Sequence, residues 1–169
     1  MMKLLGAVMI LIGCGGIGYI VVATSRYQER SLQQMVRALG HMECELQYRM
    51  SSLPELCNSA ADVCTGCLKL VLRQLSIELQ AQIIPDAPTC MHEALNKCYN
   101  VPQKLHKCLQ QLGDSLGRFD LAGQLEGLAT VKRYAEYELE QLRRNQDVRL
   151  RSYQTLGICA GAALVVLFL

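Results

Sequence analysis

The stretch LQQMVRALGHMECELQYRM, residues 32 to 50, decides the fold class because its apolar residues recur every three or four positions. This spacing places them on one face of an α-helix and leaves polar residues on the other faces. The stretch therefore predicts an amphipathic helix that packs one side against other helices. The inward residues are Leu32, Met35, Leu39, Met42, Leu46 and Met50.

The same periodicity continues towards the C-terminus. A short helix is predicted at 53–63, because Ser52 and Glu55 have the spacing of a capping box and Pro54 is tolerated in a first turn. The motif CTGC, Cys64 to Cys67, predicts a turn that leads into the next helix. Further helices are predicted at 89–99, at 101–119 and from Leu121 onwards. Their inward residues are Leu68, Leu72, Leu75, Leu79 and Ile83, then Leu105, Cys108, Leu112, Leu116 and Phe119, then Leu125, Leu128, Ala135, Leu139 and Leu142.

An uncharged run precedes this region. Residues 4–23 form twenty consecutive positions without a charge, which in a helix match the roughly 30 Å hydrocarbon core of a bilayer. Within the run, LIGC at Leu11 to Cys14 resembles a lipoprotein cleavage box, and the residues up to Ala23 resemble a signal-peptidase site. Apolar residues continue for nine positions past Cys14, which favours an uncleaved transmembrane helix. A cleaved secreted or lipoprotein form is the alternative.

A second uncharged run ends the chain. Residues 153–169, YQTLGICAGAALVVLFL, are long enough for a short transmembrane helix. Gly157 and Gly161 have GxxxG spacing, which lets two membrane helices approach closely. These two glycines are therefore candidates for packing between the membrane helices.

The arginines beside the two runs predict orientation. Their inner flanks are rich in arginine, whereas Lys3 is the single basic residue beyond them. Basic residues flank membrane spans mainly on the cytoplasmic side, so we expect residues 24–152 in the cytoplasm, where thiols stay reduced. The flanking arginines are Arg26, Arg30, Arg143, Arg144, Arg149 and Arg151.

No stretch alternates apolar and polar residues with the period of two that a strand requires. The sequence therefore predicts an all-α protein, in which an antiparallel helical bundle at 24–152 lies between transmembrane helices at 4–23 and 153–169. The net charge of +2 gives no sign of nucleic-acid binding.

The chain carries few signs of catalysis. Three histidines are scattered, and no motif for hydrolysis or phosphate binding is present. Cys64 and Cys67 have the spacing of a redox pair or of half a zinc site, but tetrahedral zinc needs two more ligands. We expect no enzyme activity, no cofactor and no metal. A membrane-tethered thiol redox or metal-binding protein is the alternative.

Two internal motifs carry a family resemblance. Glu43, Glu45 and Tyr48 are followed by Pro54 and Glu55, and LGDSLGRFD at 112–120 repeats a leucine–glycine pair before an aspartate. Together with the apolar start and the glycine-rich end, these motifs resemble the stage III sporulation protein AB family over essentially the whole chain. The family's proline precedes the leucine, whereas Pro54 here follows Leu53.

The resemblance implies a role in endospore formation. The family is similar to F-type platform proteins of type II secretion and type IV pilus systems, in which a platform couples a cytoplasmic ATPase to a membrane assembly. It implies a non-catalytic membrane adaptor of the channel complex between mother cell and forespore. The expected partners are the sporulation ATPase, stage III sporulation protein AA, and other membrane proteins of the complex.

Particular residues follow from these motifs. Glu43, Glu45, Arg118 and Asp120 are candidate partner contacts, although intramolecular ion pairs or helix caps would explain them equally well. Structural roles are expected for Tyr48, Pro54 and Glu55, and for Gly113 and Gly117, whose four-residue spacing predicts close helix approach on one helix face.

Overall fold

The computed structural model describes the backbone of residues 2–81, 86–117 and 120–168, and side chains for residues 24–81, 86–117 and 120–145. Six helices and no strands occupy these residues, which confirms the all-α prediction. The helices are α1 (Met2–Arg49), α2 (Leu53–Asp62), α3 (Gly66–Ala81), α4 (Ala87–Lys97), α5 (Gln103–Ser115) and α6 (Leu121–Phe168).

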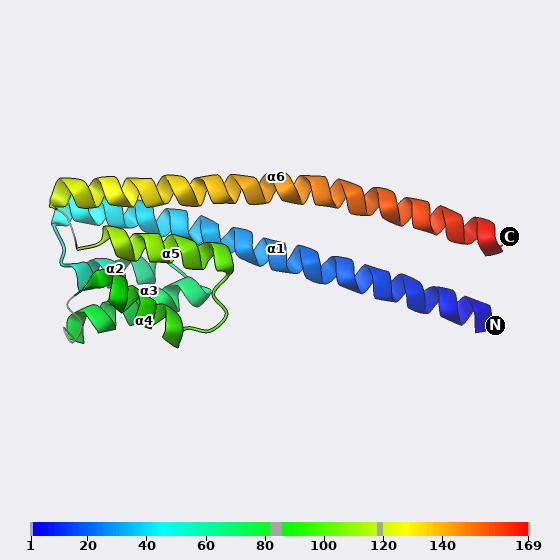
Figure 1. Cartoon of the computed structure of the whole chain (residues 1–169), viewed down its shortest axis with the longest axis horizontal. Coiled ribbons are helices and arrows are strands. Elements are labelled where there is room, and N and C mark those ends of the chain that lie inside the picture. The colour runs from blue at the N-terminus through cyan, green and yellow to red at the C-terminus, as the bar shows by residue number, and fades with distance from the viewer. Residues whose placement is uncertain (1, 82–85, 118–119, 169) are drawn as a thin grey trace. The chain divides into compact units, whose positions relative to one another are not determined.

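The chain forms two compact units. The core unit is Gln28–Leu139, and the terminal unit combines Met1–Tyr27 with Glu140–Leu169. Within the core unit, each of the helices α2 to α5 packs against the next one in the chain. These four helices lie beside the parts of α1 and α6 that belong to the same unit (Figure 1).

The predicted membrane spans fall in the terminal unit. Among the residues with described side chains, no helix combines the length and apolar character needed to cross a membrane. Both predicted spans, 4–23 and 153–169, lie in parts of α1 and α6 whose side chains are outside that description, as do Gly157 and Gly161.

The interior of the core unit is aliphatic. The inward face predicted for residues 32–46 is confirmed, because five of its residues are at most 5% exposed. The other helices add apolar side chains to the same interior, and burying each one stabilises the fold by about 1.5–3 kcal/mol. The largest contributors beyond α1 are Leu56, Leu68, Leu72, Leu75, Met91, Leu105, Leu109 and Leu112.

Ion pairs fix the neighbours of α6 in the core unit. Lys132 Nζ in α6 lies 2.7 Å from Glu43 Oε2 in α1, and Lys104 Nζ in α5 lies 2.7 Å from Glu138 Oε2 in α6. A β-carbon built on Gly127 would lie 2.9 Å from Ser115 Cβ. Helices α6 and α5 are therefore also in contact near the end of α5. The two α5–α6 contacts fit antiparallel helices, as predicted for the bundle.

Gly113 explains how α5 approaches α4. A β-carbon at Gly113 would lie 2.7 Å from the β-carbon of Met91, a distance that forces one of the helices to move. The predicted role of Gly113 in close helix approach is therefore confirmed.

The prediction for Gly117 was wrong. Helix α5 ends at Ser115, and Gly117 lies beyond it with φ of +76°, in the left-handed region that glycine adopts without a β-carbon clash. Its four-residue spacing from Gly113 thus reflects a helix end and not a shared helix face. Phe119 and Ile83, predicted as inward residues, lie outside the described residues.

Candidate partner-docking surface

Several helix ends meet at one end of the core unit. Helix α1 ends at Arg49 and α2 begins at Leu53, while α5 ends at Ser115 and α6 begins at Leu121. A β-carbon built on Gly117 would lie 3.4 Å from Leu53 Cδ1 and 3.7 Å from Ala87 Cβ, which joins the starts of α2 and α4 to the end of α5. We call residues 45–55, 86–87, 114–117 and 120–127 the loop end.

Three of the four predicted contact residues lie at or beside the loop end and have intramolecular partners. Glu43 pairs with Lys132, and Glu45 lies 3.5 Å from Arg49 Nη1 and accepts a hydrogen bond from Ser51 Oγ. Asp120 Oδ1 accepts a 3.0 Å hydrogen bond from the backbone nitrogen of Gly123. Asp120 therefore caps the start of α6, where a carboxylate also suits the helix dipole. Arg118 lies outside the described residues.

The α1–α2 turn follows its predicted chemistry. Glu55 Oε2 accepts a hydrogen bond from the backbone nitrogen of Ser52 at 3.3 Å, and the two residues form a capping box. Pro54 lies in the first turn of α2, where its missing N–H leaves no helix bond unmade. The roles of Pro54 and Glu55 in starting this helix are confirmed.

Met50 departs from its prediction. The periodicity of 32–50 predicts an inward side chain, but α1 ends at Arg49 and Met50 is 73% exposed. Its φ of +49° turns the chain out of the helix, so its side chain no longer follows the helix face. The prediction failed because an apolar residue carries no signal for a helix end.

The backbone at Met50 is costly for its residue type. Four described residues have a positive φ: Gly66, Gly117, Asn100 and Met50. Glycine and asparagine are the residues that adopt this conformation most readily, whereas the β-carbon of a bulky residue is crowded in it. The first three residues suit this conformation, whereas Met50 adopts it at the point where the chain leaves α1.

Two further apolar side chains are exposed at the loop end. Tyr48 is 80% exposed and Leu121 is 39% exposed. Tyr48 precedes the end of α1, and Leu121 is the first residue of α6. Tyr48 was predicted to have a structural role, and its exposure leaves it available for contact with another molecule.

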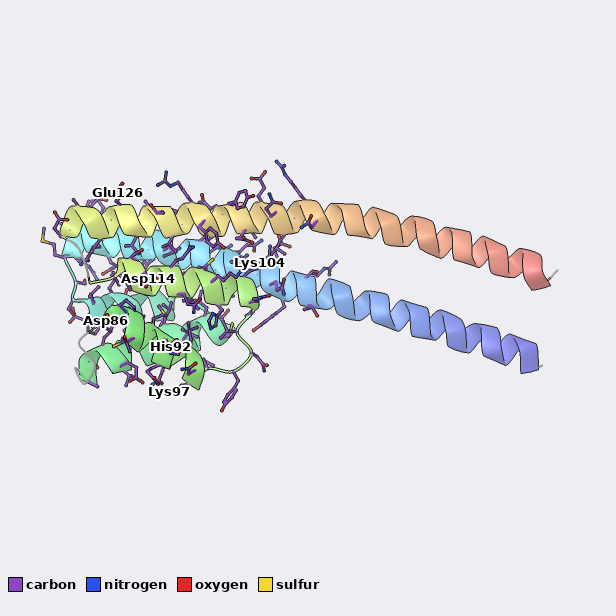
Figure 2. All side chains as sticks on the ribbon, viewed as in Figure 1. Asp86, His92, Lys97, Lys104, Asp114 and Glu126 are labelled. Carbon is purple, nitrogen blue, oxygen red and sulfur yellow. The ribbon has the colours of Figure 1, made fainter. Side chains whose placement is uncertain are left out.

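The loop end is acidic. It contains six carboxylates and one arginine, whereas the whole chain has a net charge of +2. In Figure 2, Asp86, Asp114 and Glu126 lie near the joined helix ends, and Lys104 lies near the start of α5, at the opposite end of that helix. Asp114 and Glu126 are exposed and have no ion-pair partner among the described residues. The carboxylates are Glu45, Glu55, Asp86, Asp114, Asp120 and Glu126, and the arginine is Arg49.

The cysteines of the CTGC turn differ in environment. Cys64 is buried, and desolvation raises the pKa of its thiol to about 11 despite an opposing effect of Lys69. A thiol with this pKa stays protonated at neutral pH and is a poor nucleophile. Cys67 is half-buried. Across the described residues, no group of three His, Cys, Asp or Glu side chains is placed to hold a metal ion.

Comparison with known proteins supports the resemblance. The sequence profile described as stage III sporulation protein AB matches residues 3–169. The chain belongs to this family. Family membership supports a role in sporulation.

A stage III sporulation protein AB of Bacillus subtilis (strain 168) is 23% identical over 172 residues, which cover all of both chains. A solved structure of a stage III sporulation protein AB matches with a TM-score of 0.61 and 20% identity, covering 70% of this chain and 94% of the other. At this identity the structural match supports the fold alone.

Sequence patterns missed part of the loop end in this family member. Met50 was assigned to the interior, and Asp114 and Glu126 were not singled out. The signal available for Asp114 was its place between Gly113 and Gly117, within the motif LGDSLGRFD. The charge of the loop end emerges only when separate segments are brought together by folding.

Proposed function

We propose that the protein is a non-catalytic membrane adaptor of the sporulation channel complex. In this proposal, membrane helices at 4–23 and 153–169 anchor the chain, and the intervening domain at 24–152 lies in the mother-cell cytoplasm. The domain docks the stage III sporulation protein AA ATPase to other membrane proteins of the complex. ATP hydrolysis then belongs to the partner, and this chain supplies attachment.

The observation that carries the proposal is family membership over residues 3–169. The two uncharged terminal runs and the arginines beside them add support for anchorage and orientation. The exposed loop end offers a contact surface, because it lies where α1 ends and α6 begins, away from the points where the chain enters and leaves the core unit at Gln28 and Leu139.

Contacts to the ATPase are proposed for Glu43, Glu45, Arg118 and Asp120. Glu43, Glu45 and Asp120 have intramolecular bonds, so reversing their charge would also disturb folding, and milder changes are better tests. Asp120→Asn keeps an oxygen that can cap α6 and removes the charge. If Asp120 contacts the ATPase through its charge, this variant should bind the ATPase more weakly without losing helicity.

Cysteine labelling tests topology. Cys44 is exposed on α1, whereas Cys57 is buried and desolvation raises its thiol pKa to about 12. A membrane-impermeant maleimide should modify Cys44 in lysates and spare it in intact protoplasts, and Cys57 should react only after unfolding. Modification of Cys44 in intact protoplasts would place the domain outside the cell and favour a cleaved or lipidated form.

Co-purification tests the partner. The full-length protein, extracted with mild detergent from sporulating cells, should retain the ATPase. Replacing both Cys64 and Cys67 with serine serves as the control, because a platform role predicts unchanged binding and unchanged sporulation. Absence of the ATPase from the wild-type complex would contradict the proposal, and a sporulation defect of the cysteine variant would favour the thiol alternative.

A further inference from the structure

Met50, Tyr48 and Leu121 place apolar surface in water at the loop end, among carboxylates. Isolated exposed apolar residues are common on proteins and need no explanation. These three differ because they share the loop end, where Tyr48 and Met50, two residues apart at the end of α1, are 80% and 73% exposed.

The charge around the three side chains indicates what covers them. Asp114 and Glu126 are exposed carboxylates, and the described residues of the loop end carry an excess of five negative charges. Interfaces place complementary charges opposite each other, which guides encounter and disfavours partners of the same sign. An acidic rim around an apolar centre therefore fits a partner with apolar residues inside a basic rim.

We propose that the loop end binds a basic protein surface, with Tyr48 and Met50 as the apolar centre and Asp114 and Glu126 in the acidic rim. Leu121 extends the apolar centre onto the first turn of α6. The inference rests on the proposed docking role of the loop end, but it does not depend on which protein is the partner.

A second copy of the chain is a poorer occupant. Two loop ends brought together would oppose six carboxylates with six carboxylates, and like charges that face each other weaken association. The exposed leucine and isoleucine of α3, Leu70 and Ile77, offer a weaker case for docking, because their nearest charged neighbours include both signs, with Arg73 and Lys69 close to Asp62.

Photo-crosslinking in living cells tests the proposal with the full-length chain. The variant Tyr48→p-benzoylphenylalanine keeps an aromatic ring at the loop end and forms a covalent adduct with a contacting partner on irradiation. Tyr137, 58% exposed on α6, provides a matched control position. We expect an adduct at position 48, on a partner segment rich in lysine and arginine, and a much lower yield at position 137.

Two substitutions on one helix test the charge requirement. Glu126→Lys changes the loop end, whereas Glu136→Lys changes another exposed glutamate of α6 outside it. In the position 48 background, Glu126→Lys should reduce the adduct yield several-fold, and Glu136→Lys should leave it unchanged. Equal effects of the two substitutions would overturn the charge argument.

Met50→Gly separates docking from folding. It removes the apolar side chain and suits the backbone better, so the adduct yield should fall while the thermal midpoint does not. No adduct at position 48, or an adduct on an acidic segment, overturns the proposal. An adduct with a basic segment of a protein other than the ATPase supports this inference and contradicts the proposed ATPase docking. The experiment therefore distinguishes failure of the basic-partner proposal from failure of the ATPase proposal.

Discussion

Met91 in α4 and Met50 at the loop end carry the same side chain in opposite environments. Met91 is 1% exposed and packs against Gly113 of α5, while Met50 is 73% exposed at the end of α1. The packing of the unit explains the first residue completely. The second lies where the chain turns out of α1, in a crowded conformation, and its side chain buries little. The difference separates the surface that holds the core unit together from the surface that we propose faces a partner.

The largest effect should come from truncating the buried methionine. Met91→Ala removes packed atoms and leaves a cavity beside Gly113, which should lower the free energy of unfolding by about 2–5 kcal/mol. Met50→Ala should change it by less than about 0.5 kcal/mol, as for most surface substitutions. Hydrogen exchange of the core-unit amides in the full chain measures both. Equal losses would show that Met50 also holds the unit together.

Adding a β-carbon where α4 packs against α5 should have the next largest effect on the free energy of unfolding. Gly113→Ala gains helix propensity, but its β-carbon meets Met91 Cβ at 2.7 Å, and overpacking of this kind costs about 1–3 kcal/mol. Gly40→Ala is the control, because its β-carbon would lie 3.8 Å from Lys132 Nζ and the helix should gain up to about 1 kcal/mol. A stabilised Gly113→Ala variant would show that the helices separate easily.

Changing the residue at a position of positive φ should have a smaller effect on the free energy of unfolding. The sign of the effect should be opposite for the two variants described here. Met50→Gly relieves crowding at φ +49° and should raise the free energy of unfolding by up to about 1 kcal/mol. Asn100→Met introduces the same crowding at φ +64° and should lower it by a similar amount. Thermal unfolding of the two variants side by side provides the measurement. Destabilisation by Met50→Gly would reveal an unrecognised structural role for this methionine.

The smallest effect concerns an exposed pair that joins α3 to α4. A hydrogen bond from Lys97 is the main cause that lowers the pKa of Glu78, and the same bond raises the pKa of Lys97. The contribution of the pair is therefore present at neutral pH. It is lost as the pH falls through the lowered pKa of Glu78 or rises through the raised pKa of Lys97. In Lys97→Met, an NMR titration should show the pKa of Glu78 moving up towards its ordinary value. An unchanged titration would assign the shift to Gln74, which also donates to this carboxylate.

Helix positions could be read from the sequence with small errors. The predicted helix at 53–63 is α2 at Leu53–Asp62, and the predicted helix at 89–99 is α4 at Ala87–Lys97. Apolar periodicity and cap residues act locally, so they are visible in a linear sequence. The largest deviation is at 101–119, because α5 ends at Ser115 and the chain is extended at Leu116, before the left-handed Gly117. The spacing of Gly117 from Gly113 does not indicate this helix end.

The candidate surface could be predicted only in part. Asp120 and Glu55 were recognisable because caps have a fixed distance from a helix start. The pairing of Glu43 with Lys132 joins residues 89 positions apart, and the acidic loop end combines three separate segments. Such long-range juxtapositions depend on how the helices pack. The positive φ of Met50 could not be predicted from the sequence, because methionine has no preference for that conformation.

The most direct test of loop-end docking measures stability and partner binding of Met50→Gly in the same preparation of full-length protein. We expect an equal or higher thermal midpoint together with weaker retention of the partner captured at position 48. A variant that is stabilised and still binds as tightly as the wild type would contradict the claim that the loop end is the docking surface centred on Met50.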